Sequence, residues 1–282
     1  MKKVLEVTNL CKKYPKFSLN NVSFSVDQGT IMGFIGRNGA GKTTTIKSLL
    51  HFVHPDSGVI NFFGKNFTEC EAEIKERVGY AGASNVYYQR KKIKDIVAVT
   101  KLFYSNWDDE EYRKYMKKFG LDENKKSIEL SEGMKVKFQL VLALSHHANF
   151  LILDEPTSGL DPISREELLE IFLELKDEGV TIFFSTHITS DLDKCVSQIT
   201  YIKQGEIIAF GDMKEFINKY RLVTFAESVT KKQEAAFLGV SRTAKNKQAL
   251  ILFDDQYLFQ EEQLKMPNLE TIMIHLEKEM AQ

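Results

Sequence analysis

One short segment constrains the fold of this 282-residue chain more than any other. Residues 36–43 read Gly-Arg-Asn-Gly-Ala-Gly-Lys-Thr and fit the pattern G-x-x-x-x-G-K-[ST]. The apolar run IMGFIG precedes this segment, and the sequence KTTTIKSLLHF continues it in a helical pattern. A buried strand, a glycine-rich turn and a helix in this order predict a phosphate-binding loop.

The residue types in this loop match the chemistry of phosphate binding. Glycines let backbone N–H groups close around phosphate oxygens, and the helix that follows adds its positive end. Lys42 is predicted to reach the β- and γ-phosphates of a nucleotide, and the Thr43 hydroxyl to bind Mg²⁺. The alternative is a glycine-rich turn that only starts a helix. The flanking strand and helix favour phosphate binding over that alternative.

A second motif is the apolar run Phe150–Leu153, which ends in Asp154 and Glu155. A buried strand would deliver Asp154 beside the metal ion. Glu155 would then be placed to polarise a water molecule for in-line attack on the γ-phosphate. A strand followed by an acidic turn is common in proteins, so this prediction depends on the phosphate loop in the same chain.

The remaining pattern predicts an α/β fold. Buried-strand candidates at residues 78–82, 150–154 and 180–187 are separated by helical patterns, which favours a mostly parallel sheet. Residues 1 to about 30 alternate apolar and polar side chains, as in an antiparallel β subdomain. A helical insert is predicted over about 86–145, and its charged and aromatic part covers about 86–129.

The chain length fits one large α/β domain plus a smaller appendage, and two full domains are not expected. The cassette with the phosphate chemistry covers residues 1–215, and a small C-terminal α/β extension covers residues 216–282. The extension contains the strand-like runs LVTFAES and ALILF and the helix-like run PNLETIMIHLEKEM. We expect it to be an accessory or regulatory unit.

Composition excludes several classes of protein. The 38 basic and 39 acidic residues leave a net charge of -1, so no global field attracts nucleic acid or anionic lipid. Cys11, Cys70 and Cys195 form no C-x-x-C pair, which argues against a zinc site or a disulfide framework and fits a reducing cytoplasm. No run approaches the roughly 18 apolar residues of a membrane span. The chain is expected to be neither secreted nor membrane-spanning.

With these motifs in this order, residues of about 1–215 resemble the ATP-binding subunits of ABC transporters. The segment Leu130–Met134, LSEGM, resembles the LSGGQ signature of that family, and Ser158–Asp161 resembles its D-loop. His187 is similar to the switch histidine, and Tyr14 occupies the place of the aromatic side chain that stacks on adenine. The order and the spacing of the motifs carry the resemblance. It implies the P-loop NTPase fold of an ABC cassette.

The resemblance implies ATP and Mg²⁺ as cofactors and assigns a role to each matching residue. The expected catalytic residues are Lys42, Glu155 and His187, and the expected metal ligands are Thr43 and Asp154. The expected nucleotide contacts are Tyr14, Gly36, Asn38, Gly39, Ala40, Gly41, Lys42, Thr43, Thr44, Ser131, Gly133 and Asp161. Ser131 and Gly133 open an apolar helix, whose positive end suits the γ-phosphate held by a second cassette.

The resemblance further implies a motor that works on a partner. Two cassettes, identical or different, would close around ATP and hydrolyse it, which drives a separate membrane permease. The cassette would sit in the cytoplasm, attached to the inner face of the membrane through the permease. Similarity is greatest to exporter-type cassettes for peptides, drugs or toxins in Gram-positive bacteria, including phenol-soluble modulin exporters.

Two alternative functions remain within the same resemblance. A soluble ABC ATPase that acts on nucleic acid or ribosomes is disfavoured, because the chain has one cassette and no sustained heptad run. An ATP-binding regulator without hydrolysis is disfavoured by the presence of both Glu155 and His187.

The chain departs from the family pattern at two places. Ala83 stands where the family usually has a glutamine, sometimes a glutamate, that touches the metal and the attacking water. Ser84 is adjacent, whereas Gln89 lies several residues out of register and is not counted as a substitute. In the signature, Glu132 and Met134 replace Gly and Gln, so a negative charge lies near the expected polyphosphate. Both departures concern the rate of hydrolysis.

Aromatic residues are concentrated in the helical insert, at Tyr87, Tyr88, Phe103, Tyr104 and Trp107. Tyrosine and tryptophan are favoured as interface anchors, so we expect the two adjacent tyrosines to contact the permease. Phe103 is expected to pack inside the insert instead.

Overall fold

The computed structural model describes residues 2–82, 88–225, 229–242 and 246–279. The chain divides into two compact units, Met1–Phe210 and Gly211–Gln282, where the sequence predicts a boundary after residue 215. The phosphate loop lies in the first unit.

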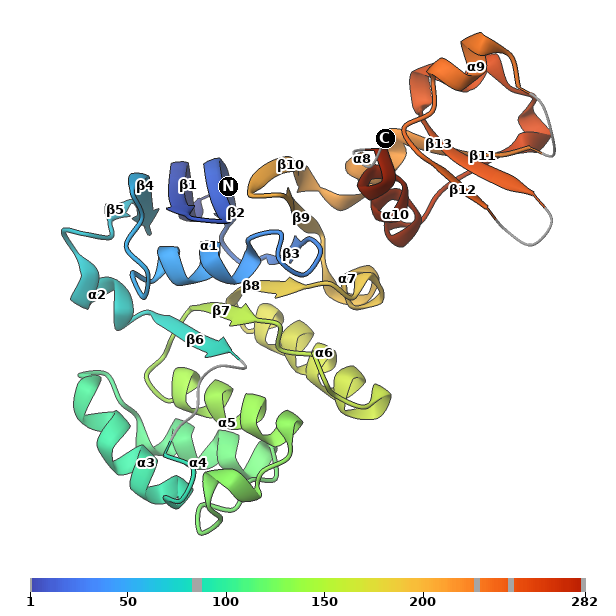
Figure 1. The fold of residues 1–282 in the computed structure, drawn as a ribbon. Helices are drawn as coiled ribbons and strands as arrows, with labels where there is room; N and C mark the ends of the chain where they lie inside the picture. The colour runs from blue at the N-terminus through green and yellow to red at the C-terminus, as the bar shows by residue number, and fades with distance from the viewer. Residues whose placement is uncertain (1, 83–87, 226–228, 243–245, 280–282) are drawn as a thin grey trace. The chain divides into compact units, whose positions relative to one another are not determined.

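A six-stranded sheet forms the centre of the first unit (Figure 1). Its strand order is β10-β9-β3-β8-β7-β6, and the pairs β3/β8, β3/β9, β6/β7 and β7/β8 are parallel. The strands are β3 (Ile31–Ile35), β6 (Val78–Gly82), β7 (Phe150–Asp154), β8 (Thr181–Thr186), β9 (Gln198–Lys203) and β10 (Glu206–Asp212). Every residue of β3, β7 and β8 is buried, as expected of parallel strands that are covered on both faces.

A second sheet in this unit has the order β2-β1-β4-β5, and its three strand pairs are antiparallel. It contains β1 (Lys3–Tyr14), β2 (Phe17–Asp27), β4 (Ser57–Phe62) and β5 (Lys65–Asn66). Helix α1 (Lys42–Leu49) lies between the two sheets (Figure 1). Its buried Ile46 and Leu49 share one apolar core with Phe62 of β4 and Phe183 of β8, so the antiparallel sheet holds this helix from the other side.

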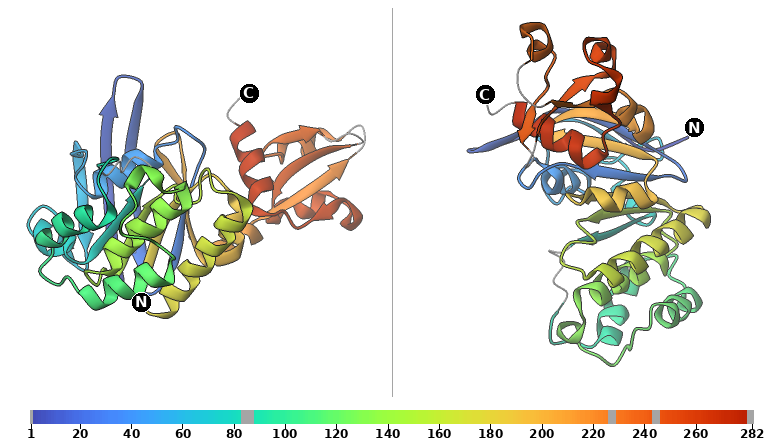
Figure 2. Two further views of the ribbon diagram at one scale, coloured as in Figure 1. Left: turned by 90° about the horizontal axis from the view of Figure 1, so that it is seen from below. Right: turned by 90° about the vertical axis from the view of Figure 1, so that its right-hand side faces the viewer.

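A helical insert lies between β6 and β7 in the chain. It contains α3 (Ile93–Thr100), the 3₁₀ turns η1 (Lys101–Phe103) and η2 (Ser127–Glu129), α4 (Asp109–Lys118) and α5 (Glu132–Leu144). Figures 1 and 2 show these helices gathered on the side of the unit away from the antiparallel sheet. The remaining helices of the unit are α2 (Glu71–Lys75), α6 (Pro162–Asp177) and α7 (Thr189–Cys195).

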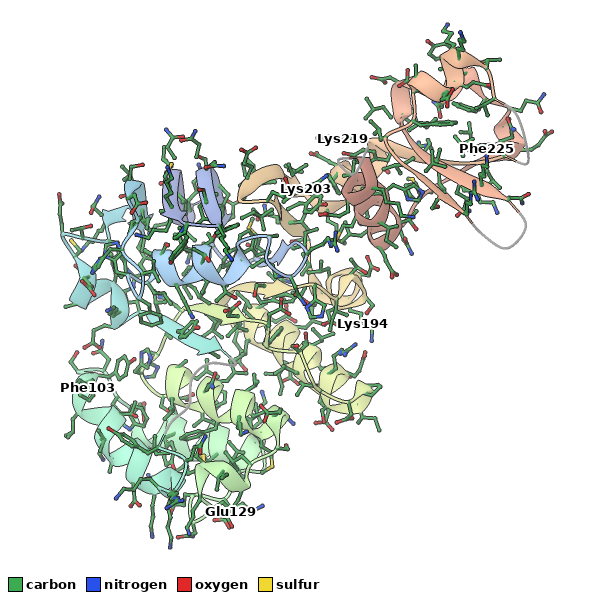
Figure 3. The ribbon with its side chains drawn as sticks, in the orientation of Figure 1. Phe103, Glu129, Lys194, Lys203, Lys219 and Phe225 are labelled. Carbon is green, nitrogen blue, oxygen red and sulfur yellow. The ribbon has the colours of Figure 1, made fainter. Side chains whose placement is uncertain are left out.

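The prediction that Phe103 packs inside the insert is wrong, because its side chain is 76% exposed (Figure 3). Helix α3 buries Ile93, Ile96 and Val97 instead. Phe103 follows in η1, after the buried face of α3 has ended. Tyr104, the next residue, stacks on the ring of His146 with 3.8 Å between ring centroids.

The second unit is a small α/β structure with its own core. Its sheet has the order β12-β13-β11-β14, formed by β11 (Tyr220–Phe225), β12 (Val240–Arg242), β13 (Lys247–Leu252) and β14 (Leu264–Lys265). The helical segments are α8 (Met213–Asn218), α9 (Lys231–Ala235), α10 (Leu269–Glu279), η3 (Phe253–Leu258) and η4 (Glu261–Gln263). Val223, Ala249 and Ile251 are fully buried in the core.

The predicted fold class is confirmed: a mostly parallel sheet, an antiparallel β subdomain, a helical insert and a small α/β extension. Within the part of the chain that the structure describes, no helix is both long and apolar enough to cross a membrane.

Candidate functional site

The predicted phosphate loop connects β3 to α1, and three glycines give it its shape. Gly39 and Gly41 have left-handed backbone conformations, with φ of 82° and 117°. A Cβ atom on Gly36 would lie 2.4 Å from the carbonyl oxygen of Ile202, so no larger residue fits there. Such a tight turn before a helix N-terminus points its backbone amides toward one place, which is what a phosphate group requires.

Lys42 is the first residue of α1, and its side chain is only 5% exposed. The ammonium group donates hydrogen bonds to the backbone carbonyls of Gly36, at 2.7 Å, and Arg37, at 3.3 Å. It also forms an ion pair with the Glu155 carboxylate, with Nζ 3.0 Å from Oε1. A buried charge needs such partners, and together they fix a positive charge against the phosphate loop.

Glu155 follows β7 and has a strained backbone. Its φ is 53°, in the left-handed region that costs a residue with a side chain roughly 1–2 kcal/mol. The backbone N–H of Glu155 donates to the hydroxyl of Ser185, at 2.9 Å, and its Oε2 lies 2.7 Å from Nδ1 of His187. Because Oε1 contacts Lys42, the structure brings the three predicted catalytic side chains into one contact group.

The two predicted metal ligands also lie together. The Thr43 hydroxyl donates to Oδ1 of Asp154 at 3.2 Å, and the Ser185 hydroxyl donates to the same oxygen at 2.7 Å. Hydroxyl and carboxylate oxygens are hard donors of the kind that Mg²⁺ prefers, and this ion is commonly held by one or two carboxylates together with phosphate oxygens. The oxygen atoms of Thr43 and Asp154 therefore fit a magnesium ion that a nucleotide would share.

Ser185 is a site residue that no motif in the sequence identifies. It lies in β8 directly beside Asp154 of β7 and connects the Asp154 carboxylate to the Glu155 backbone. The available signal was the polar pair Ser185-Thr186 at the end of the apolar run that precedes His187. Parallel strands end at the same edge of a sheet, so a polar residue there was a candidate neighbour of Asp154.

We expect Ser185→Ala to lower the free energy of unfolding by about 1–3 kcal/mol, because a buried carboxylate oxygen loses a donor. ATP turnover should also fall, by roughly tenfold, since Asp154 and Glu155 would both be less well held. Thermal unfolding and phosphate release would measure the two effects. Ser145→Ala is the matched control, because that buried hydroxyl donates to the carbonyl of Val141, four residues earlier in the chain. Equal effects of the two variants on turnover would contradict the role of Ser185.

Ser131, Gly133 and Asp161 form a second group. Ser131 caps α5 by accepting from the N–H of Met134 at 3.3 Å, and Asp161 caps α6 by accepting from the N–H groups of Ile163 and Ser164. A Cβ atom on Gly133 would lie 3.6 Å from Leu160, so the signature turn lies beside the D-loop.

The unusual acid of the signature segment, Glu132, has a counter-charge one turn along α5. Its carboxylate lies 2.6 Å from the ammonium group of Lys135. An exposed pair of this kind contributes little to stability. It does offset part of the negative charge that Glu132 adds at the start of α5.

The remaining predicted nucleotide contacts lie in or near the phosphate loop. Tyr14 ends β1 and pairs in register with Phe17, whose ring lies 2.8 Å from the position of a Cβ on Gly41. Asn38 is exposed, Ala40 is buried and Thr44 is half-buried. Ala83, Ser84 and Tyr87, which the sequence analysis singled out, lie outside the described residues.

Comparison with known proteins gives consistent matches. The family model described as "ABC transporter" matches residues 19–158. "Bacitracin transport ATP-binding protein BcrA" of Bacillus licheniformis is 34% identical over 78% of this chain and 74% of that protein. "ABC transporter ATP-binding protein YtrB" of Bacillus subtilis (strain 168) is 28% identical over 74% and 71% respectively. The solved "Structure of ATP binding subunit of ABC transporter" has a TM-score of 0.68 and 28% identity, and covers 75% of this chain and 91% of that one.

Proposed function

The chain belongs to the ABC transporter family as an ATP-binding subunit, and on that premise we propose that it hydrolyses ATP to drive a separate membrane permease. The observation that carries the proposal is the contact group of Lys42, Glu155 and His187 beside the phosphate loop. A loop that only bound phosphate would not need a carboxylate and an imidazole at this place.

The proposed chemistry is attack of water on the γ-phosphate. Glu155 accepts the proton of the attacking water as general base, and its strained backbone and two partners fix the carboxylate. The ammonium group of Lys42 contacts the β- and γ-phosphates and offsets part of their negative charge. His187 donates a hydrogen bond to the γ-phosphate. Mg²⁺, held by the Thr43 hydroxyl and by the Asp154 carboxylate that Ser185 orients, would neutralise charge on the phosphate oxygens.

A second cassette completes the proposed site. Ser131 and Gly133 lie at the exposed start of α5, where a hydroxyl group and the positive helix end can contact the γ-phosphate bound to the other cassette. The D-loop lies beside them and would face the same interface. The pair of cassettes can be identical or different, and each nucleotide would lie between them.

The proposed partner is an integral membrane permease that holds this subunit at the inner face of the cell membrane. Two relatives are named for bacitracin transport, and this supports a role in the export of peptides, drugs or toxins. The phosphate-binding and catalytic motifs of the sequence all lie before the unit Gly211–Gln282, so we assign this unit an accessory or regulatory role.

An apolar face on the helical insert is the proposed contact with the permease. Val99, at the end of α3, lies three residues before Leu102 and four before Phe103 of η1, so each of these two side chains is a neighbour of Val99 on the helical surface. Leu102 is 80% exposed. Exposed apolar side chains in one place mark an interaction site, and a short cytoplasmic helix of the permease with its own apolar face would cover them.

Negative charges introduced on this apolar face should weaken binding of the subunit to the permease. In the variant that combines Leu102→Asp and Phe103→Asp, we expect permease binding to weaken by about tenfold or more, because apolar anchors dominate such interfaces. ATP binding should stay unchanged. Co-purification of the tagged chain from detergent-solubilised membranes is the measurement. Val59→Asp, which charges an exposed apolar side chain on the antiparallel sheet, is the control. Undiminished co-purification of the double variant would rule out this face.

The reaction itself is tested by phosphate release from ATP with the purified full-length chain. We expect release with Mg²⁺ and none above background with excess EDTA, because the metal neutralises the phosphate oxygens. ADP and phosphate should form in equal amounts. Saturable ATP binding without any Mg²⁺-dependent release, also in the presence of the permease, would instead support a regulator that does not hydrolyse ATP.

A further inference from the structure

Gln139, in the middle of α5, forms two hydrogen bonds with the backbone of Gly82. Because α5 begins in the signature segment Leu130–Met134, it is called the signature helix below. Gln139 lies on α5 two helical turns after the Ser131 cap, at 5% exposure, in the buried stretch Phe138–Leu144 whose other residues are all apolar. Its Oε1 accepts from the backbone N–H of Gly82 at 2.9 Å, and its Nε2 donates to the carbonyl of the same residue at 3.4 Å. A buried amide is costly without partners, and here one residue supplies both.

Gly82 is the last residue of β6, which is the edge strand of the central sheet. On its inner side β6 pairs with β7, and Gly82 lies in register with Asp154. The Gln139 amide provides the donor and the acceptor that a further strand would have provided on the outer side. Gly82 is also enclosed by side chains, since a Cβ atom there would lie 2.4 Å from the Tyr80 hydroxyl and 3.5 Å from Cβ of Asp154.

The contact joins the two groups of the proposed site. Helix α5 packs against β6 (Figure 1) and begins at Ser131, which would face the nucleotide of the other cassette. Beside Gly82, Asp154 accepts hydrogen bonds from Thr43 and Ser185. A two-point hydrogen bond fixes the orientation as well as the distance of the groups that it joins. A displacement of α5 would therefore be passed to the edge of the sheet that carries Asp154.

We propose that Gln139 is a positioning residue that couples the signature helix to the metal-binding edge of the same cassette. The inference rests on the proposed ATP hydrolysis. Contact of Ser131 with the second cassette would set the position of α5, and the Gln139–Gly82 link would then set the alignment of Asp154 and its neighbour Glu155. Gln139 touches neither nucleotide nor metal in this role.

The first test replaces the amide by an apolar side chain of similar length in the full-length protein. In Gln139→Met we expect the turnover number for ATP to fall by about tenfold to a hundredfold, because a small displacement at a catalytic centre has effects of this size. The dissociation constant for ATP should change less than about twofold, since the phosphate loop is untouched. ATP turnover per chain should also depend less on protein concentration, because the contact with the second cassette would no longer be passed through α5. Gln198→Met is the control, because Gln198 bonds to Asp27 away from this path.

The second test uses pH and keeps the inference falsifiable if the first variant folds poorly. In Gln139→Glu, a protonated carboxyl group can make both hydrogen bonds to Gly82, whereas an ionised one can only accept. Burial raises the pKa of a carboxyl group, so the bonds should form at low pH and fail as the pH rises through the raised pKa. The turnover of this variant relative to the wild type should therefore fall between about pH 6 and pH 8.

The outcomes separate the inference from the proposed function. A Gln139→Met variant with turnover within about twofold of the wild type, or a Gln139→Glu variant whose relative turnover is flat with pH, would overturn the coupling role. A lowered melting temperature with unchanged turnover would show that the amide only stabilises the fold. If the wild type neither binds nor hydrolyses ATP, the proposed function itself fails, whereas normal wild-type activity with unaffected variants refutes the coupling alone.

Discussion

Replacement of Glu155 by glutamine should reduce the rate of ATP hydrolysis by about 10²- to 10⁴-fold, the usual contribution of a general base. The amide keeps the shape of the side chain and can still accept from Lys42, at the position that now lies 3.0 Å from its ammonium group. It cannot take a proton from water. Because the shape and the contact with Lys42 are retained, the dissociation constant for ATP should stay within about threefold of the wild type.

The measurement is phosphate release under single-turnover conditions, combined with size-exclusion chromatography in Mg²⁺ and ATP. If hydrolysis separates the two cassettes, Glu155→Gln should accumulate as the ATP-bound pair. Glu166→Gln, which changes an exposed carboxylate that pairs with Lys194 on the outside of α6 and α7, is the control and should behave as the wild type. Hydrolysis by Glu155→Gln at a near wild-type rate would show that another group is the base.

Loss of the Lys42 ammonium group should act on binding. In Lys42→Ala we expect ATP affinity to fall by about 30-fold or more, because truncation of a buried, hydrogen-bonded charge costs roughly 2–5 kcal/mol. The phosphate loop would lose the charge that the structure fixes against Gly36 and Arg37. Titration calorimetry with ATP measures the change.

Lys47→Ala is the control for this variant, since it removes the same charge from the last turn of the same helix. A fold check by circular dichroism is needed for both, because Lys42 is also the buried partner of Glu155. If a folded Lys42→Ala variant binds ATP as tightly as the Lys47→Ala control, the phosphates of ATP are not bound beside Lys42.

The sequence predicts those strands and helices whose own residues show one clear hydrophobic pattern. β6 and β7 are predicted with their observed bounds, because each contains a short run of apolar or small residues, which in β7 ends at the acidic residue Asp154. β9 and β10 were not identified as strands. The residues between them, Gln204 and Gly205, both have positive φ and form a turn between two strands, and β10 alternates exposed and half-buried residues at the edge of the sheet.

The site shows the same limit at the level of side chains. Lys42, Thr43, Asp154 and Glu155 stand in motifs, and their expected roles follow from residue type and local order. Ser185 and Gln139 act through contacts with residues that are 31 and 57 positions away along the chain. Such contacts depend on strand register and helix packing, for which a single sequence gives no local signal.

The exposure of Phe103 illustrates a third limit. An aromatic side chain at the end of an amphipathic helix can face the core or an interface, and its residue type is the same in both cases. The structure decides, because α3 already buries three aliphatic side chains on its inner face.

Binding of ATP to the purified full-length chain tests the central claim most directly, because every proposed step requires a nucleotide in the phosphate loop. Equilibrium dialysis with radiolabelled ATP and Mg²⁺ is the measurement, with Lys42→Ala in parallel. We expect saturable binding that approaches about one ATP per chain, with an affinity in the micromolar to millimolar range of typical enzyme substrates, and much weaker binding by the variant. Absence of saturable binding by the wild type up to about 10 mM ATP, ten times the upper end of that range, or equal binding by the variant, would contradict this expectation.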